Sequence, residues 1–456
     1  MFRKLLLLAC LWPAVTFGLG PKSVPLRQGA ASIDRQILAL APVLWLDGKR
    51  TSSLTVGSDR AISAWLDKSG NGYDFAQGTA ANKPFLTRSD SLENRLKQSE
   101  EFDEAGSWSL SYVTVDDQAT TDPLGGGGAD KVIETANNQI HAINQAFETV
   151  KGATYVISVY AKIWNGRNYL TISPTSTGFP AGYITFNLDT GVVSTTSGAA
   201  TGAIESIGSG WYRCSITITS DESSASSGLF YYITADDGAT LTYLGDITKG
   251  IYLWGAHLRR SSASSTYLAT STYPVYAGLN GRAVPYFPGA ATYMSRAFTA
   301  ALDIGVGDNT IFAVVKADGA KDTAGGYFIY ANETFETRGS MWAFRDTDGV
   351  ALVRTNQAGG STSLIGVTEL PQTLSLWSAR KGTGANGLFV NGVTDGSDTT
   401  ISNAVSASAD AFTLANNASA NRGLRGYLPE LLVFGRALSN YELGRLTSLI
   451  KRREQM

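Results

Sequence analysis

Alternating apolar and polar positions near the C-terminus predict a β-hairpin and a further strand. The apolar run Leu388–Val390 ends at Asn391-Gly392. An Asn-Gly dipeptide beside apolar runs favours a two-residue turn, because both residues tolerate positive φ angles. A later apolar run, Glu430–Phe434, predicts another strand in the same region.

The residues after this strand carry a complete helix start signal. Ser439 is the expected N-cap, and Glu442, three residues later, completes a capping box. Leu438 and Leu443 fit the hydrophobic staple that often accompanies such a start. Apolar residues then recur on one face, namely Leu443, Leu446, Leu449 and Ile450. We therefore predict a C-terminal amphipathic helix that packs on a β-sandwich.

Two apolar segments near the N-terminus predict strands that end at polar turns. Val43–Asp47 and Ala61–Asp67 each place apolar side chains ahead of an aspartate. The turn-rich sequence Lys68–Gly72 follows the second segment. Upstream, Ile33–Leu40 predicts a short helix that ends before Pro42.

Short strands separated by turn signals fill the middle of the chain, from about Asn94 to Tyr273. The predicted strands are Lys131–Glu134, Tyr155–Tyr160, Tyr169–Ile172, Tyr183–Leu188, Trp211–Thr219, Leu229–Thr234 and Ile251–Leu258. Regular short strands with turns between them are typical of a β-sandwich.

A third strand-rich stretch begins after Pro274. Its predicted strands are Thr310–Val315, Tyr327–Tyr330, Met341–Arg345, Val350–Arg354 and Leu374–Arg380. Ile311–Val315 is apolar at successive positions, so we expect both faces of this strand to be buried. The sequence shows no repeat of fixed period, which argues against a propeller or a solenoid.

Composition supports an all-β protein. The chain has 456 residues, of which 49 are glycine and 17% are charged, a mix typical of short strands and tight turns. A net charge of −2 offers no basic field for nucleic acid at the whole-chain level. Cys10 and Cys214 are too few for a disulfide framework, and the alternation around Cys214 predicts that it is buried.

Sequence motifs for catalysis are missing. Neither His141 nor His257 has a second histidine at metal-ligand spacing, and the chain contains no nucleophile elbow, P-loop or dinucleotide fingerprint. A glycosidase needs two facing carboxylates. Glu430 stands alone on its strand, and Asp346 and Asp348 belong to a predicted turn. We therefore expect a protein that is not an enzyme.

Two separated segments resemble the laminin-G-like jelly rolls of the concanavalin A-like class. The first is LWLDGKRTSSLTVGSDRAISAWLDKSGNG, and the second runs from AVPYFPGAATYM to GYLPELLVFGRALSNYELGRL. The second ending is the more specific of the two. Members of the family often carry acidic residues where this chain has Phe287–Ala290, and their absence weakens a calcium or ligand role there.

The segment between them is similar to the carbohydrate-binding-like β-sandwich modules of tailed-bacteriophage virion proteins. It includes NRLKQSEEFDEAGSW, GSGWYRCSITIT and GIYLWGAHLRR. Together the resemblances imply an all-β fold with a discontinuous concanavalin A-like jelly-roll sandwich, residues 37–90 and 275–456. A second β-sandwich, residues 91–274, is inserted into it. An apolar N-terminal arm, residues 1–36, and the C-terminal amphipathic helix complete the expected fold.

This combination implies a non-enzymatic structural protein of a virion, such as a head or tail fibre or a decoration component. The arm of residues 1–36 would dock on other virion proteins, and the lectin-like sandwiches would contact host surface glycans. We expect a homo-oligomer, because virion proteins repeat around symmetry axes. The alternative is a secreted or lipid-anchored bacterial adhesin with lectin-like domains, and a glycan-cleaving enzyme is a third, disfavoured one.

The N-terminal sequence leaves two locations open, the virion and the secreted or bacterial surface location. MFRKLLLLACLWPAVTFGLG has a basic start and an apolar run, as a secretory signal peptide does, and LLAC resembles a bacterial lipobox. Against export, Trp12-Pro13 interrupts the run and no small-x-small cleavage site follows. The run is also short for a transmembrane helix.

Aromatic and planar polar residues gather near one predicted turn of the inserted sandwich. Sugar sites use aromatic faces for the apolar side of the ring and planar polar groups for its hydroxyls. The candidate glycan-binding residues are Trp164, Arg167, Asn168, Tyr169 and Trp108. The alternative is that Trp164 and Tyr169 fill the core, where aromatic residues dominate. Core packing is also expected for Trp45, Trp65, Trp211, Trp254 and Trp377.

We expect no cofactor. Jelly rolls of this type often hold calcium through oxygen ligands. The acidic and amide residues near predicted strands are Asp47, Asp67, Asp303, Asp308 and Asn309, and they lack Asp-x-Asp-x-Asp spacing. Turn capping explains each of them equally well, so a calcium site is left open and no metal ligand is assigned.

Overall fold

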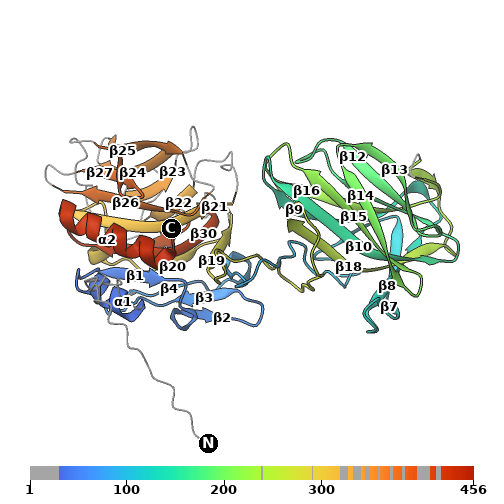
Figure 1. Ribbon diagram of the computed structural model, residues 1–456, viewed down its shortest axis with the longest axis horizontal. Helices are drawn as coiled ribbons and strands as arrows, with labels where there is room; N and C mark the ends of the chain where they lie inside the picture. The colour runs from blue at the N-terminus through green and yellow to red at the C-terminus, as the bar shows by residue number, and fades with distance from the viewer. Residues whose placement is uncertain are drawn as a thin grey trace, which may run out of the picture.

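The computed structural model describes residues 30–237, 240–289, 291–318, 327–331, 340–344, 350–357, 360–369, 373–382, 386–397, 411–416 and 423–456. These residues form two β-rich lobes that a narrow connection joins (Figure 1). Residues 1–29 of the predicted arm and the predicted turn at Asp346 and Asp348 lie outside the described residues.

Both sheets of the first lobe combine strands from the two ends of the chain. One sheet has the order β28-β27-β26-β21-β30-β19-β5, with β1 also paired to β30. Its strands are β1 (Leu44–Asp47), β5 (Phe85–Leu86), β19 (Pro285–Pro288), β21 (Asn309–Ala317), β26 (Ser375–Lys381), β27 (Gly387–Val390), β28 (Val393–Gly396) and β30 (Arg425–Phe434). All the pairings in this sheet are antiparallel.

The facing sheet has the order β2-β3-β4-β20-β29-β22-β23-β24-β25. Its strands are β2 (Leu54–Val56), β3 (Ile62–Trp65), β4 (Phe75–Ala76), β20 (Met294–Arg296), β22 (Tyr327–Ala331), β23 (Ser340–Phe344), β24 (Val350–Gln357), β25 (Gly360–Glu369) and β29 (Phe412–Leu414). One continuous core lies between the two sheets and includes Trp65, Phe75, Ile311, Trp377 and Leu431. The first lobe is therefore an antiparallel β-sandwich built from discontinuous sequence.

Strand β1 shows the discontinuity directly. Leu44 pairs with Val433 and Trp45 with Leu432, so the first strand of the fold lies beside the last. Trp45 and Val433 therefore lie in the same sandwich. The predicted hairpin is confirmed, because β27 and β28 are joined by Asn391 and Gly392, whose φ angles are 54° and 86°.

Two helices cover the outer face of the first sheet. The C-terminal helix α2 (Asn440–Glu454) has Ser439 as N-cap, and the capping box with Glu442 is complete, as predicted. The apolar face of α2 packs with Ile33 and Ile37 of α1 (Ala30–Leu38) on Trp45 and Phe312 of the sheet. Figure 1 shows α2 lying across β30 and β26.

The second lobe is another antiparallel sandwich. Its sheets have the orders β14-β15-β10-β18-β8-β7 and β13-β12-β11-β16-β9-β17, with β6 paired to β9. The strands are β6 (Ser109–Ser111), β7 (Val113–Thr120), β8 (Ala129–Glu134), β9 (Asn138–Thr149), β10 (Thr154–Trp164), β11 (Tyr169–Pro174), β12 (Gly182–Asn187), β13 (Val192–Gly198), β14 (Thr201–Gly208), β15 (Trp211–Thr219), β16 (Ser224–Thr234), β17 (Thr242–Leu244) and β18 (Gly250–Arg260).

The predicted fold class, all-β with sandwiches, is confirmed. Every strand predicted in the middle of the chain occurs, and β15 has the predicted bounds, Trp211–Thr219. The strands β6, β7, β9, β13, β14 and β17 were not predicted. No helix among the described residues is long and apolar enough to cross a membrane.

Candidate functional site

The predicted glycan-binding residues do not form one exposed surface. Trp108 has only 2% of its surface exposed, and its ring packs on Phe102 and Tyr231 with centroids 4.9 and 6.1 Å away. Its indole Nε1 donates to the carbonyl of Gln98 at 2.8 Å. Trp108 is thus a core residue of the second sandwich, and its ring offers no free face to a sugar.

Arg167 is engaged inside the sandwich. Its guanidinium forms two hydrogen bonds with Glu134, one of them 2.8 Å from Nη2 to Oε2. Tyr243 donates to the same carboxylate at 2.7 Å, and its ring lies 5.0 Å from the guanidinium. Burial raises the pKa of Glu134, but the hydrogen bonds from Arg167 and Tyr243 outweigh it and hold that pKa below its usual value. Arg167 and Tyr243 thus donate hydrogen bonds to the buried Glu134 carboxylate, and the contact between Glu134 and Tyr243 links β8 to β17.

Trp164, Asn168 and Tyr169 are half-buried where β10 ends and β11 begins. The Lys131 ammonium lies 5.0 Å from the centroid of the Trp164 ring. Tyr169 accepts a long hydrogen bond of 3.4 Å from Asn187. Trp164 and Tyr169 are absent from the buried core of this lobe, and neither lines the cavity described next.

A cleft of about 800 Å³ lies between the two sandwiches, beside the connection that joins them. The first sandwich contributes Ala80, Ala81, Phe85 and Pro288, and the second contributes Arg95, Lys97, Gln98, Glu104, Gly106, Ser107 and Gln145–Glu148. The returning linker contributes Thr272–Pro274 and Tyr276. The volume is within the range typical of small-molecule sites. We take this interdomain cleft as the candidate functional site.

The cleft lies at the point where the second sandwich is inserted into the first. The two linkers that cross between the sandwiches pair with each other, because Asn94 and Val275 exchange backbone hydrogen bonds of 2.9 and 2.8 Å. The backbone N–H of Arg88 also donates to Tyr276 at 3.0 Å. We call these paired segments, residues 87–94 and 275–284, the neck. Both walls of the cleft therefore extend from the hydrogen-bonded neck.

One wall of the cleft is aromatic. Tyr273 and Tyr276 of the returning linker lie 5.2 and 6.0 Å from Phe85, measured between ring centroids. Tyr276 also packs on Tyr286 at 4.1 Å. Tyr273 is half-buried, whereas Phe85 and Tyr276 are 7% exposed. The ring of Tyr273 is thus the most accessible aromatic surface in the cleft.

The other wall is polar and its charges balance. Gln145 is 4% exposed and exchanges hydrogen bonds with the backbone of Lys97, 2.7 Å from N–H to Oε1 and 3.0 Å from Nε2 to the carbonyl. Glu148 forms a 3.2 Å ion pair with Arg425 of the first sandwich. The charged residues in the lining are Arg95, Lys97, Glu104 and Glu148, two of each sign.

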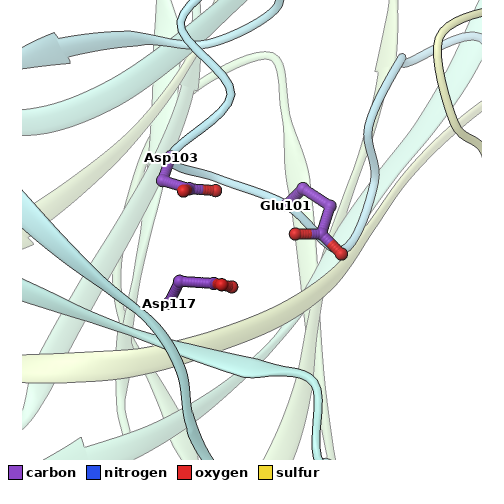
Figure 2. A group of neighbouring side chains, drawn as sticks. All are labelled: Glu101, Asp103 and Asp117. Carbon is purple, nitrogen blue, oxygen red and sulfur yellow. The ribbon is translucent and has the colours of Figure 1, made fainter.

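Three carboxylates meet elsewhere on the second sandwich. Glu101, Asp103 and Asp117 place carboxylate oxygens within 4.8 Å of one another, and Figure 2 shows the three groups facing a common space. Oxygen ligands of this kind suit calcium. Glu101 is half-buried and the other two side chains are exposed. No sequence motif marks these three residues, because they lack a fixed spacing.

The acidic residues weighed as calcium ligands in the first sandwich have other partners. The ammonium of Lys381, which is 5% exposed, donates to the carbonyl of Gly305 beside Asp303 and Asp308. Asp67 caps backbone N–H groups of Trp45 and Ser69 at 2.9 and 2.8 Å. Lys381 thus supplies the positive charge near Asp303. Asp67 caps a turn, as the turn-capping interpretation predicts.

The described histidines and cysteine pack in the interior. His257 is 2% exposed and lies 2.8 Å from the carbonyl of Glu93, and burial lowers its pKa to about 4. His141 is fully buried beside Tyr243, with ring centroids 4.7 Å apart. Burial raises the pKa of the Cys214 thiol, which keeps it protonated. The predicted burial of Cys214 is therefore confirmed.

Comparisons with known proteins give only remote likenesses. No protein-family description and no curated protein matches the chain. A Trypanosoma rangeli sialidase bound to the inhibitor DANA is 11% identical and covers 86% of this chain and 69% of its own, with a TM-score of 0.27. The CBM22-1–CBM22-2 tandem of Paenibacillus barcinonensis Xyn10C is 11% identical over 79% of this chain and 100% of its own, with a TM-score of 0.24.

Proposed function

We propose that the protein is a non-enzymatic, lectin-like protein that binds a glycan in the interdomain cleft. The observation that carries the proposal is the pairing of an aromatic wall at Tyr273 with a polar wall at Lys97, which is exposed, and Gln98, which is half-buried. An aromatic face suits the apolar side of a pyranose, and planar amide or charged groups suit its hydroxyls. The proposed binding requires neither a metal nor a cofactor.

Binding is favoured over cleavage because of the carboxylates in the cleft. A glycosidase needs a pair of carboxyl groups, one of which stays protonated. Glu104 and Glu148 are the carboxylates among the described lining residues. The ion pair between Glu148 and Arg425 favours the ionised form of Glu148. This ion pair engages the Glu148 carboxylate with the first sandwich, which favours a structural role for it over that of a general acid.

We further propose that the protein works on a bacteriophage virion as a head or tail fibre or decoration component. This part rests on the resemblance of the sequence to tailed-phage virion proteins. Residues 1–36 would dock on a neighbouring virion protein, the protein would be a homo-oligomer, and the cleft would face host glycans. A secreted or lipid-anchored adhesin with the same cleft is the alternative, and proteomics of purified particles distinguishes the two.

The glycan site is tested with two aromatic variants. Tyr273→Ala removes the accessible ring of the cleft, and Trp164→Ala removes the ring at the end of β10. A glycan array would first identify a ligand for the wild-type protein, and calorimetry would then compare the variants. We expect Tyr273→Ala to lose affinity and Trp164→Ala to keep it. The opposite pattern would place the site at Trp164, and an empty array would contradict the proposal.

A further inference from the structure

One buried carboxylate joins the two sandwiches. Asp318 directly follows β21 of the first sandwich and is 2% exposed. It accepts hydrogen bonds from Arg95, at 3.1 Å from Nη2 to Oδ2, and from Nη1 of Arg260. Both arginines belong to the second sandwich, Arg95 just after the neck and Arg260 at the end of β18. Asp318 thus contacts both lobes at one point.

The partners of Asp318 are themselves fixed by further contacts. Tyr286 of β19 donates from its hydroxyl to Asp318 Oδ2 at 2.7 Å. Glu93 forms a 3.3 Å ion pair with Arg95 and also accepts from the backbone N–H of Arg260. Burial raises the pKa of Asp318, but Arg95 and Arg260 outweigh it and hold that pKa below its usual value. We call Asp318, Arg95, Arg260 and Tyr286 the Asp318 joint.

The Asp318 joint is continuous with the floor of the cleft. Arg95 lines the cleft, and its guanidinium lies 5.4 Å from the centroid of the Tyr276 ring. Tyr276 packs in turn on Tyr286, which binds Asp318. A movement of one sandwich against the other at this joint would therefore shift the aromatic wall relative to the polar wall.

A second contact crosses between the sandwiches at Glu148, which also lines the cleft. Arg425 of β30 pairs with Glu148 at 3.2 Å and donates to the carbonyl of Thr149 at 3.4 Å. Here the carboxylate of Glu148 is half-buried, whereas in the Asp318 joint the carboxylate is buried and Arg260 is the half-buried partner. Ion pairs near solvent contribute little to stability, whereas a buried charge must keep its partners.

We propose that Asp318 is a positioning residue that locks the two sandwiches at one angle and so preorganises the cleft for its ligand. This proposal rests on the proposed glycan site and concerns how the shape of that site is maintained. Domains joined by short linkers move relative to each other unless their interface is extensive. Charged hydrogen bonds are directional, so the Asp318 joint restricts the orientation of the two sandwiches more than an apolar contact would. A cleft with preorganised walls binds its ligand more tightly, because less conformational entropy is lost when the ligand binds.

The test compares Asp318→Asn with a matched control, Asp90→Asn. The substitution at 318 keeps the shape of the side chain but removes its charge from two arginines. Asp90 pairs with Arg88 in the exposed part of the neck and lies outside the joint. Small-angle X-ray scattering of each full-length variant without ligand reports the angle between lobes, and calorimetry with the array-identified glycan reports affinity.

We expect Asp318→Asn to scatter as a flexible two-lobe particle and to lose affinity about tenfold or more, while Asp90→Asn matches the wild type. Compact, wild-type scattering from Asp318→Asn would overturn the proposed lock even if no glycan were ever found. A flexible particle with unchanged affinity would overturn the link to the cleft. Absence of glycan binding by the wild type would instead contradict the proposed function and leave the scattering result to judge the lock.

Asp318→Asn removes the carboxylate that pairs with Arg260 and leaves Arg95 with Glu93, and so it carries a risk of misfolding. A milder variant, Tyr286→Phe, removes only the hydroxyl that donates to Asp318. We expect it to give the same broadened scattering to a smaller degree, with circular dichroism unchanged. A Tyr286→Phe protein as rigid as the wild type, together with a misfolded Asp318→Asn, would count against Asp318 as a lock and favour a purely structural role.

Discussion

Trp45 and Glu430 lie 385 residues apart in the sequence, yet the indole Nε1 of Trp45 donates a 2.7 Å hydrogen bond to Oε1 of Glu430. Glu430 is fully buried and also accepts from Arg453 of the C-terminal helix. Arg453 donates in addition to Asp47, the last residue of β1. One arginine thus links the first strand, the last strand and the closing helix of the discontinuous sandwich.

Replacing Arg453 with methionine should destabilise the first sandwich strongly. Asp47 would keep Lys68 at 3.1 Å and Glu430 would keep Lys49 at 3.7 Å, but both buried carboxylates would lose the arginine that they share. Breaking a buried ion pair typically costs about 3–5 kcal/mol. Urea unfolding followed by tryptophan fluorescence measures the loss. Arg452→Met is the matched control, because Arg452 is an exposed neighbour that donates to the carbonyl of Ser448 on its own helix. Equal stability of the two variants would refute a structural role for the Arg453 cluster.

Local patterns predicted much of this fold. The Asn391-Gly392 hairpin and the Ser439 capping box depend on residues next to each other in sequence, and both occur as expected. Strand β9 was missed because NQIHAINQAFET mixes polar residues into its buried positions. His141 and Gln145 are examples, since both are buried within that strand. Their hydrogen-bond partners, which make such burial tolerable, cannot be seen in a period-2 pattern.

The cleft and its joint could not be predicted, for a topological reason. Its walls come from segments such as Ala80–Phe85 and Gln145–Glu148, which carry no shared motif and meet only because one sandwich is inserted into the other. Arg95 and Asp318 are 223 residues apart. The site at Trp164 was predicted because aromatic and polar residues are close together in the sequence there. The sequence does not show that Glu134, on another strand, binds the guanidinium of Arg167.

Removing the N-cap of α2 should weaken the docking of the closing helix. Ser439 accepts from the backbone N–H of Glu442 at 3.3 Å, and its own N–H donates to Glu442 Oε2 at 2.9 Å. Ser439→Ala should lower the free energy of unfolding by about 1 kcal/mol, as N-cap losses usually do. Ser448→Ala, in the exposed interior of the same helix, should be neutral or slightly stabilising. Equal effects would mean that the cap contributes nothing.

Asp130 should make the second sandwich less stable as pH rises. Burial raises the pKa of Asp130 to about 7, and the neighbouring carboxylates of Asp117 and Asp103 add to the rise. Between pH 4 and pH 7 the folded protein therefore keeps a proton that the unfolded chain has lost. Folding stability falls across that window and then levels off above pH 7.

The variant Asp130→Asn isolates this effect. Both oxygens of Asp130 accept backbone N–H groups, from Phe102 at 2.8 Å and Gln118 at 3.0 Å, so an amide loses one acceptor and costs stability at every pH. The difference between wild type and variant should nevertheless shrink from pH 5 to pH 8, as the wild type loses its advantage. Thermal melts at the two pH values measure it, with the exposed Asp189→Asn as control. A pH-independent difference would contradict the raised pKa.

Gly278 of the neck should not tolerate a side chain. A Cβ atom at this position would lie 1.9 Å from the carbonyl oxygen of Arg88 and 2.3 Å from that of Arg282. Both atoms belong to the backbone, so the neck itself would have to move, and overpacking of this kind costs about 1–3 kcal/mol. Because the neck forms the base of both cleft walls, Gly278→Ala should also expose the linkers to limited proteolysis.

The control for this prediction is Gly78→Ala. A Cβ at Gly78 meets no atom within 4 Å, so this exposed residue should accept alanine without loss. We expect proteolysis to cut Gly278→Ala within residues 271–284 and to leave Gly78→Ala as resistant as the wild type. Resistance of Gly278→Ala to proteolysis, with an unchanged unfolding midpoint, would show that the neck accommodates the added Cβ without opening, and it would contradict this prediction.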